Sequence, residues 1–473
     1  MRKVIIILYC LILIQCKTET TSSPLPQAPP NIILIMTDDQ GYGDLSSFGA
    51  TDIHTPNIDR LAKEGSKYTR FYVPQSQCTP SRAGILTGCY PNRVGIDWVF
   101  LPHSETGLHT DEATIADILK PIGYSTAYLG KWHLGHHQKF LPTNQGFDYY
   151  YGIPYSNDMW PNNPRKDYTF PPLPLIENEV TIDTVDAVIQ KNMTKVLTEK
   201  ATEFITLHKE DPFFLMLSHP MPHVPLYVSD KFKGKSKRGL YGDVMLELDW
   251  STGAILETLE KFNLEDNTMI MYMSDNGPWL AYGNHSGSTG GLYEGKETSY
   301  EGGIRSPLLI KYPNLVPTGK TINTPINGID ILPTIAAITE APLPNKKIDG
   351  KNIIPQLTEE SNTMAHDAYF FYMNKNQLES VMTKKWKLIL PHSYNSLDGR
   401  PGGNDGALAP YKKVTVRTQL FNIEKDKYEK HNVAKANPDI VLNLSTKADS
   451  IRNILGDKII GIQGSQVRPL GKI

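Results

Sequence analysis

Four short apolar segments, each followed at once by polar residues, constrain the fold of this 473-residue chain most strongly. They are residues 32–36, 125–129, 213–217 and 269–273. Continuous apolar runs of about five residues are typical of strands buried on both faces, as in a parallel sheet covered by helices. Helical periodicity is found between them, at residues 55–65, 114–120, 193–208 and 241–264. We therefore predict an α/β fold with a large mixed, mostly parallel sheet flanked by helices.

The pattern changes from about residue 341 onwards. Short segments typical of antiparallel strands follow, at residues 368–372, 379–383, 385–390 and 418–422, and then a helix at residues 438–455. We predict a catalytic domain over residues 31–340 and a smaller C-terminal α+β subdomain over residues 341–473 with a short antiparallel sheet. The net charge of −2 and the pI of about 6.7 provide no basic field, so no nucleic-acid partner is expected.

The first 30 residues do not belong to the predicted fold. A basic start precedes an apolar run at residues 4–14, which is too short for a permanent membrane anchor and is typical of a secretory signal. Residues 13–16, Leu-Ile-Gln-Cys, resemble a bacterial lipobox, although Gln15 departs from the usual small residue. We expect residues 1–16 to be a lipoprotein-type signal peptide with lipidation at Cys16; the alternative is cleavage elsewhere with an incidental Cys16. Residues 17–30, rich in Thr, Ser and Pro, are predicted to be a flexible tether.

These features predict an exported protein of the bacterial cell envelope, with secretion as the alternative. Any membrane contact would be made only through the N-terminal lipid.

Acidic residues follow the first and the fourth apolar segments. Asp38 and Asp39 come after the first, and Asp275 and Asn276 after the fourth. The carboxyl ends of parallel strands meet at one edge of a sheet, so these side chains are expected to converge there. Oxygen ligands of this kind suit calcium or magnesium, and not zinc. Each pair alone is more typical of a solvated turn than of a metal site, but the position of both pairs after an apolar strand favours a metal site.

Basic residues follow the second segment. Lys131 and His133 are two positions apart, and on an extended chain they would point to the same side. Lysine can hold an oxygen of an anion, and histidine can accept a proton near neutral pH. The third segment is likewise followed by His219 and His223.

The segment Cys78-Thr79-Pro80-Ser81-Arg82, with Thr87-Gly88 shortly after it, carries the most specific signal. A single cysteine is usually a small buried apolar residue, and Cys78 and Cys89, the two cysteines outside the leader, could also pair. Thr79 as a cap and Pro80 at the first helical position predict a helix directly after Cys78, with its N-terminus able to face an anion. In every fixed position the segment resembles the signature C-x-P-S-R-x-x-x-x-T-G of the formylglycine-dependent sulfatases.

In that family a dedicated formylglycine-generating enzyme oxidises the cysteine to an aldehyde, which hydrates to a gem-diol. One hydroxyl attacks sulfur and forms a covalent sulfate hemiester, and loss of the proton from the other hydroxyl re-forms the aldehyde and expels sulfate. The resemblance therefore implies that the maturation enzyme is a partner of this chain and that Cys78 is modified. In that case Cys89 is left unpaired.

From residue 31 to about residue 338, the chain is similar to the arylsulfatase A and N-acetylgalactosamine-6-sulfatase branch of the alkaline-phosphatase superfamily. The resemblance implies one Ca²⁺ ion bound by Asp38, Asp39, the modified Cys78, Asp275 and Asn276. It also implies that Arg82 and Lys131 support the aldehyde hydrate and that His133 is the base that triggers sulfate elimination. The residues expected to contact sulfate are Lys131, Ser156, His223 and Lys296, and the last two are also expected to assist departure of the alcohol.

The predicted function is hydrolysis of sulfate esters on polysaccharides or oligosaccharides. Two irregular segments, at residues 158–174 and 392–411, are expected to reach the mouth of the pocket. One alternative is a phosphatase or phosphodiesterase of the same superfamily, which would use Ser or Thr and two transition metals. The other is a non-catalytic lipoprotein that captures sulfated glycans with an unmodified Cys78.

Overall fold

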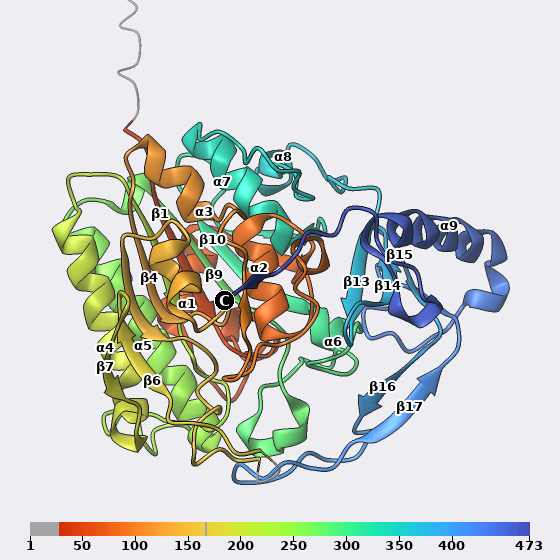
Figure 1. The fold of residues 1–473 in the computed structure, drawn as a ribbon, viewed down its shortest axis with the longest axis horizontal. Helices are drawn as coiled ribbons and strands as arrows, with labels where there is room; N and C mark the ends of the chain where they lie inside the picture. Colours follow the sequence, from red (N-terminus) through yellow and green to blue (C-terminus); the bar gives the residue numbers. More distant parts are fainter. Residues whose placement is uncertain (1–27, 166–167) are drawn as a thin grey trace, which may run out of the picture.

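A single large sheet forms the centre of the molecule in the computed structural model, which describes residues 28–165 and 168–473 (Figure 1). The predicted signal peptide and most of the predicted tether therefore lie outside the described residues. The sheet has 11 strands, with β12 (Ile326–Asn327) paired to β2 beside the main path. The main path runs in the order β11 (Lys320–Ile322), β2 (Ser66–Tyr72), β10 (Arg305–Lys311), β9 (Thr268–Ser274), β1 (Asn31–Thr37), β8 (Phe213–Ser218), β4 (Ser125–Lys131), β5 (Tyr149–Ile153), β6 (Pro174–Glu177) and β7 (Val180–Thr184).

The four predicted strands are β1, β4, β8 and β9, and they lie side by side in parallel at the centre of the sheet. Their ends are aligned, because Thr37 is opposite Ser274, while Met36 and Gly130 are both opposite Ser218. The sheet is mixed, since β10 runs antiparallel to both β9 and β2. The predicted fold class is confirmed, and the register brings the segments after the four strands to one edge.

Alternate residues of β1 enter two different cores, which is why the strand is apolar throughout. Ile32 and Leu34 pack in one core and Ile33 and Ile35 in the other, and all four are almost fully buried. Burial of such a side chain contributes roughly 1.5–3 kcal/mol. The first core includes residues of α2 (Cys78–Thr87), α3 (Ile115–Leu119) and α7 (Ile331–Thr339), and the second includes residues of α1 (Pro56–Glu64), α4 (Ala187–Leu207) and α5 (Gly239–Lys261).

Helix α4 begins six residues earlier than the periodicity predicts. Its first turn is capped by the Asp186 carboxylate, which accepts hydrogen bonds from the backbone N–H groups of Val188 and Ile189. Such a cap satisfies donors that would otherwise lack a partner, so the helix can start before its apolar face does.

The C-terminal part forms a second sheet, at the right of Figure 1, whose four strands are all antiparallel, as predicted. The order is β13 (Tyr369–Met373), β14 (Gln377–Met382), β15 (Trp386–Ile389) and β18 (Gln419–Asn422). Helix α9 (Pro438–Leu455) packs Leu444, Ala448 and Leu455 into a third core with this sheet. The remaining short elements are α6 (Glu301–Ile304), α8 (Ile354–Leu357) and β3 (Thr106–Gly107), which pairs with β19 (Gly471–Lys472) near the end of the chain.

The prediction of an irregular segment at residues 392–411 is wrong at its start. Strand β16 (His392–Ser396) pairs there with β17 (Lys412–Val416). The alternation of buried His392, Tyr394 and Ser396 with more exposed neighbours is the period of two that a strand requires.

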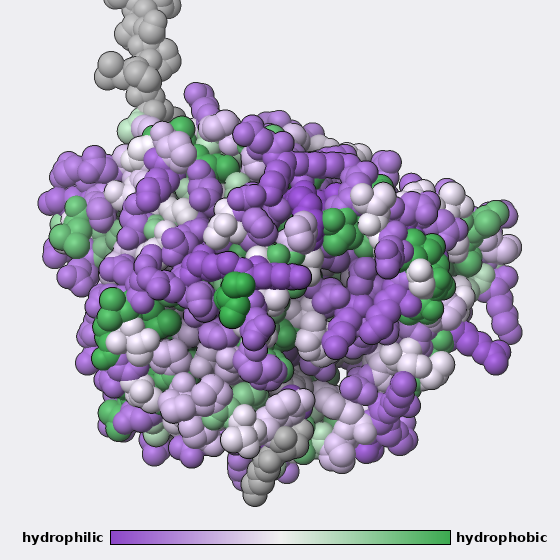
Figure 2. All heavy atoms as spheres, viewed as in Figure 1, coloured by the Kyte–Doolittle hydropathy of each residue, from purple (hydrophilic) through white to green (hydrophobic). Residues whose placement is uncertain are grey.

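Within the described residues, no helix is long and apolar enough to cross a membrane. The face shown in Figure 2 is mainly hydrophilic, with hydrophobic side chains in small scattered groups.

Candidate active site

The strand ends place the predicted acidic residues against one another. Asp275 donates its backbone N–H to Thr37 O at 3.0 Å, and the backbone N–H of Asp39 donates to Asp275 Oδ1 at 3.2 Å. Asn276 Nδ2 donates to Asp39 Oδ1 at 2.7 Å. Together with Asp38, these side chains are all at least 96% buried, so the predicted convergence of four oxygen-bearing residues is found.

Cys78 lies at the edge of this acidic group. It is the first residue of α2, and the helix is capped by Gln77 without a side-chain hydrogen bond. The predicted cap at Thr79 is therefore wrong: its hydroxyl instead accepts a hydrogen bond from the backbone N–H of Phe100 at 3.2 Å. Cys78 Sγ lies 3.3 Å from Asp38 Oδ1 and 3.9 Å from Asp39 Oδ1. Both described cysteines, Cys78 and Cys89, are free thiols, so they are not paired.

Three cations face the carboxylates. Lys131 Nζ lies 2.5 Å from Asp38 Oδ2, and both side chains are fully buried. Lys296 Nζ lies 2.6 Å from Asp39 Oδ1 and 3.3 Å from Cys78 Sγ. Arg82 holds Asp275 Oδ2 with Nε at 2.9 Å and Nη2 at 2.8 Å. The cations stabilise carboxylates that burial alone would disfavour as anions.

The close packing of β4 on β8 fixes the position of Lys131. Gly130 precedes it with φ of +108°, and a Cβ at this position would lie 1.9 Å from Ser218 O. Arg82 then joins the two strands, because Nη1 donates to Lys131 O at 2.8 Å and to Ser218 Oγ at 2.6 Å. Arg82 thus has two roles: it orients the Asp275 carboxylate, and it fixes the end of β4 through the backbone carbonyl of Lys131.

The charges determine the protonation states. Burial would raise the pKa of Asp38, but Lys131 and the other nearby cations hold it well below its ordinary value. Burial and the charge of Asp38 raise the pKa of Asp275 to about 6, against the effect of Arg82. Burial, followed by the charge of Asp38, raises the pKa of the Cys78 thiol well above its ordinary value. In this arrangement the unmodified thiol is protonated and a poor nucleophile.

His133 lines the same cavity as Cys78 and has an unusual backbone. Its φ of +63° is left-handed, so the predicted extended geometry of residues 131–133 is wrong; its backbone N–H donates to Pro154 O at 3.1 Å. Burial and the charge of Lys131 hold the pKa of His133 well below its ordinary value, so the ring is neutral. Nε2 lies 3.0 Å from Phe100 O and therefore carries the proton, since a carbonyl only accepts. The buried Nδ1 has no hydrogen-bond partner among the described residues and can accept a proton.

His223 also lies beside the acidic group and lines the same cavity. Its Nε2 lies 3.5 Å from Asp39 Oδ2, while Nδ1 lies 2.5 Å from Val224 O. Ser156 accepts a hydrogen bond from Lys131 Nζ at 3.1 Å. His219, whose role the sequence leaves open, is buried away from these groups and bonds Ser251 through Nε2 at 3.1 Å.

A cavity of about 120 Å³ opens beside these residues. Five of the residues that line it were predicted: Cys78, His133, Ser156, His223 and Lys296. The segment at residues 158–174 also reaches it, as predicted, through Asp158, Met159, Arg165, Tyr168 and Phe170. The aromatic residues Trp98 and Trp279 were missed, because they stand in irregular segments with no local periodicity. The Lys296 ammonium lies 4.8 Å from the centre of the Trp279 ring, which helps to hold both side chains.

The residues of this site fit a divalent cation with oxygen ligands. Ligand atoms of Asp38, Asp39, Cys78 and His223 lie within 4.8 Å of one another. Asn276 Oδ1 is buried and accepts no hydrogen bond within the described part of the chain, as expected for an oxygen reserved for an ion. Asp275 contributes a carboxylate whose orientation Arg82 fixes. Carboxylate and amide oxygens are the ligands of hard cations.

Comparison with known proteins identifies the class. The family model for sulfatases matches residues 30–341, and a second model, N-sulphoglucosamine sulphohydrolase, C-terminal, matches residues 290–399. The chain belongs to the sulfatase family, and it is an enzyme that hydrolyses sulfate esters.

Its relatives differ in the molecules after which they are named. Human steryl-sulfatase is 35% identical, with 86% of this chain and 84% of that protein covered. The N-acetylgalactosamine-6-O-sulfatase of Bacteroides thetaiotaomicron is 33% identical, with 89% and 93% covered. Among solved structures, Ps i-CgsB in complex with k-i-k-neocarrahexaose has a TM-score of 0.74 at 30% identity, with 89% of this chain and 92% of that chain covered.

Proposed function

We propose that this sulfatase removes sulfate from sulfated carbohydrate through a formylglycine derived from Cys78, with one Ca²⁺ ion at the acidic group. The observation that carries the proposal is the position of Cys78 Sγ, 3.3 Å from both Asp38 Oδ1 and Lys296 Nζ at the first residue of a helix. The sulfur stands in for the oxygen atoms of the hydrated aldehyde. A nucleophile at this point is close to the residues that would hold the ion and to a cation that can bind sulfate.

The surrounding residues have separate tasks in this scheme. Lys131 and Lys296 donate hydrogen bonds to the oxygens of the sulfate group and offset its charge. The neutral His133 accepts through Nδ1 the proton of the remaining hydroxyl, so the C–O bond to sulfate breaks as the aldehyde re-forms. His223, whose Nε2 lies 3.5 Å from Asp39 Oδ2, assists the departure of the alcohol. When bound, calcium supplies Lewis-acid polarisation of a sulfate oxygen.

The carbohydrate substrate is supported by two observations. The first is the names of the relatives, which include an N-acetylgalactosamine-6-O-sulfatase and a structure holding a neocarrahexaose. The second is the cavity wall, where the indole groups of Trp98 and Trp279 offer flat apolar surfaces next to polar groups. The relation to steryl-sulfatase makes aryl and steryl sulfates the appropriate comparison substrates.

Two measurements test this function. The enzyme is produced with and without a formylglycine-generating enzyme, and the peptide containing residue 78 is analysed by mass spectrometry. We expect an aldehyde oxygen in place of the thiol and one hydrogen, and turnover only in the modified preparation. Assays on sulfated oligosaccharides, their phosphorylated counterparts, and aryl and steryl sulfates then define the substrate. Full activity with an intact thiol would refute the mechanism, and activity confined to aryl or steryl esters would refute the carbohydrate assignment.

The matched control is Cys89→Ala. Cys89 is buried just after the other end of α2, and it does not line the active-site cavity formed by the described residues. We expect Cys78→Ala to be inactive and Cys89→Ala to retain turnover.

The proposed location, an exported protein of the bacterial envelope lipidated at Cys16, is tested separately by metabolic labelling with a fatty acid. Labelling that persists in Cys16→Ala would refute lipidation at that residue.

A further inference from the structure

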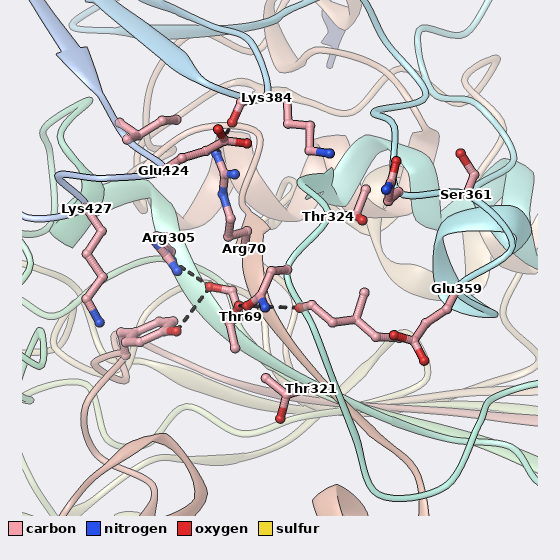
Figure 3. Close-up of a pocket in the computed structure, with 15 residues that line it drawn as sticks. Thr69, Arg70, Arg305, Thr321, Thr324, Glu359, Ser361, Lys384, Glu424 and Lys427 are labelled. Atoms are coloured by element: carbon pink, nitrogen blue, oxygen red, sulfur yellow. Dashed lines mark hydrogen bonds between the residues drawn. The ribbon is translucent and has the colours of Figure 1, made fainter.

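A second and larger cavity lies between the edge of the central sheet and the C-terminal subdomain (Figure 3). Its volume is about 790 Å³. The walls come from β2, β10 and β11, from residues 359–362, from Lys384 between β14 and β15, and from residues 423–427 after β18. Within the described residues, it shares no lining side chain with the active-site cavity.

Two buried arginines form part of its wall. Arg305 is 4% exposed; its Nε donates to Thr69 O at 2.6 Å, and its Nη1 donates to Glu301 Oε2 at 3.2 Å. Arg70 is 6% exposed, and its Nη2 donates to Lys384 O at 2.6 Å. Figure 3 shows both of these arginine hydrogen bonds to backbone oxygens. Arg70 Nε is buried and has no hydrogen-bond partner in the part of the chain that the structure describes.

The buried charges behind this wall do not balance. Lys387 lies 3.1 Å from Glu301 Oε1 and 2.9 Å from Glu429 Oε1, so it is shared between two carboxylates. Arg305 binds the same Glu301, and Arg70 adds a third cation. These buried groups therefore comprise three cations and two carboxylates, an excess of one positive charge. Buried charge without a partner is strongly unfavourable, and a bound anion would relieve it.

The rim of the cavity adds to this excess. Lys384 and Lys427 also line the cavity, and Lys427 Nζ lies 4.9 Å from the centre of the Tyr428 ring. Two acids, Glu359 and Glu424, also line it, and Glu359 lies 3.6 Å from Lys320. Cationic side chains therefore outnumber acidic ones in the lining by four to two.

We propose that this cavity is a second anion-binding site, which takes one sulfate-like oxyanion. Arginine presents a planar set of donors that matches such an oxyanion, and both Arg70 and Arg305 line the cavity. Hydroxyl and amide groups of Thr324, Ser361 and Asn362 can serve the remaining oxygens. The oxyanion is either free sulfate or a sulfate group on a glycan chain, and only the second source depends on the proposed carbohydrate function.

The direct test uses selenate, which has the shape and charge of sulfate and an anomalous X-ray signal. Crystals of the full chain soaked in sodium selenate should show an anomalous peak between Arg70 and Arg305. Isothermal titration of the enzyme with selenate, with a sulfated oligosaccharide and with the same oligosaccharide after desulfation then distinguishes the sources. Binding of selenate alone supports a site for the free anion, and additional binding of the sulfated glycan at this cavity supports the glycan source.

The variants are chosen so that folding is preserved. Lys384→Ala/Lys427→Ala removes two rim charges but keeps the Lys384 carbonyl that Arg70 binds. Lys412→Ala/Lys413→Ala, on the exposed strand β17, is the control with the same change in charge. We expect the first variant to weaken selenate binding at this cavity about tenfold, and the control to leave it unchanged. Turnover of a small aryl sulfate should be the same in both variants.

A selenate peak confined to the active-site cavity would overturn the proposal, as would equal affinities in the two variants. Continued hydrolysis of sulfated glycans in that case would leave the proposed function intact. Conversely, selenate binding in an enzyme that hydrolyses only aryl esters would retain the anion site while refuting the carbohydrate substrate.

Discussion

Lys387 provides a sharp test of how buried charges hold the C-terminal sheet to the part of the chain that precedes it. It lies on β15, is fully buried, and contacts Glu301 and Glu429 at 3.1 and 2.9 Å. Lys387→Met keeps the length of the side chain and removes its charge. The two carboxylates then face each other with Arg305 as the remaining ion-pair partner of Glu301.

The expected penalty follows from the burial of all three groups. Removal of one partner from a buried ion pair costs about 3–5 kcal/mol, because the other charge is left without compensation. Burial already raises the pKa of Glu429 to about 7, even with Lys387 present. Without the lysine, the pKa of Glu429 rises further. The pKa of Glu301, which Lys387 and the neighbouring arginines hold below its ordinary value against the effect of burial, rises as well, and protonation relieves the repulsion. The loss in unfolding free energy should therefore be larger at pH 8 than at pH 5.

The measurement is urea unfolding followed by tryptophan fluorescence at both pH values. The matched control is Lys385→Met, two residues earlier, where the lysine side chain is exposed and the loss should be below about 0.5 kcal/mol. The double variant Lys387→Met/Glu429→Gln should regain part of the stability, because the carboxylate that loses its ion-pair partner is then replaced by a neutral amide. Equal losses for the two lysine variants, or a loss that does not depend on pH, would refute the reasoning.

Three further predictions concern the site and a second buried acid. His133→Gln should lower kcat on a sulfate ester about 10²- to 10⁴-fold while near-UV circular dichroism stays unchanged; a loss below tenfold would exclude His133 as the base. Removal of divalent cations by EGTA should abolish turnover and lower the melting temperature, and added Ca²⁺ should restore both; unchanged melting would argue against an ion at the acidic group. Burial raises the pKa of Glu379 from 4.5 to about 8, so the folded state binds this proton more tightly than the unfolded state and stability falls as pH rises across that interval. Relative to the wild type, Glu379→Gln should gain up to about 1.4 kcal/mol per pH unit between pH 5 and 8 in urea unfolding, and a constant difference would contradict the assignment.

The sequence predicts those strands whose residues are apolar throughout because both faces of the strand are buried. Strands β1, β4, β8 and β9 are buried on both faces, so their apolar runs are continuous and their ends can be located within two residues. Strand β2 has no such run, because the partly exposed Lys67 and Thr69 alternate with its buried residues and because one of those buried residues is the charged Arg70. Its antiparallel neighbour β10 contains Arg305 and Pro307, which obscure the strand pattern further.

The same limit applies to the candidate site. Its charged residues follow strands or fall in a fixed motif, and the structure brings them together. The backbone of His133 was predicted incorrectly, because a left-handed residue outside glycine has no sequence signature. Trp98 and Trp279 enter the cavity from irregular segments, where only tertiary contacts decide which way a side chain points. Arg70 and Arg305 are far apart in sequence, and only the antiparallel pairing of β2 with β10 places them in one wall.

Helix α2 is buried along its whole length, and Cys78 retains only 2% of its accessible surface. For the proposed oxidation of this side chain, that burial imposes an order of events. A formylglycine-generating enzyme cannot bind residues 78–82 once the surrounding helices and the central sheet have packed around them. It therefore has to act on the nascent or still unfolded polypeptide. A chain that folds before this oxidation keeps the thiol at Cys78 and stays inactive. The active fraction of a preparation would then depend on the rate of oxidation relative to the rate of folding.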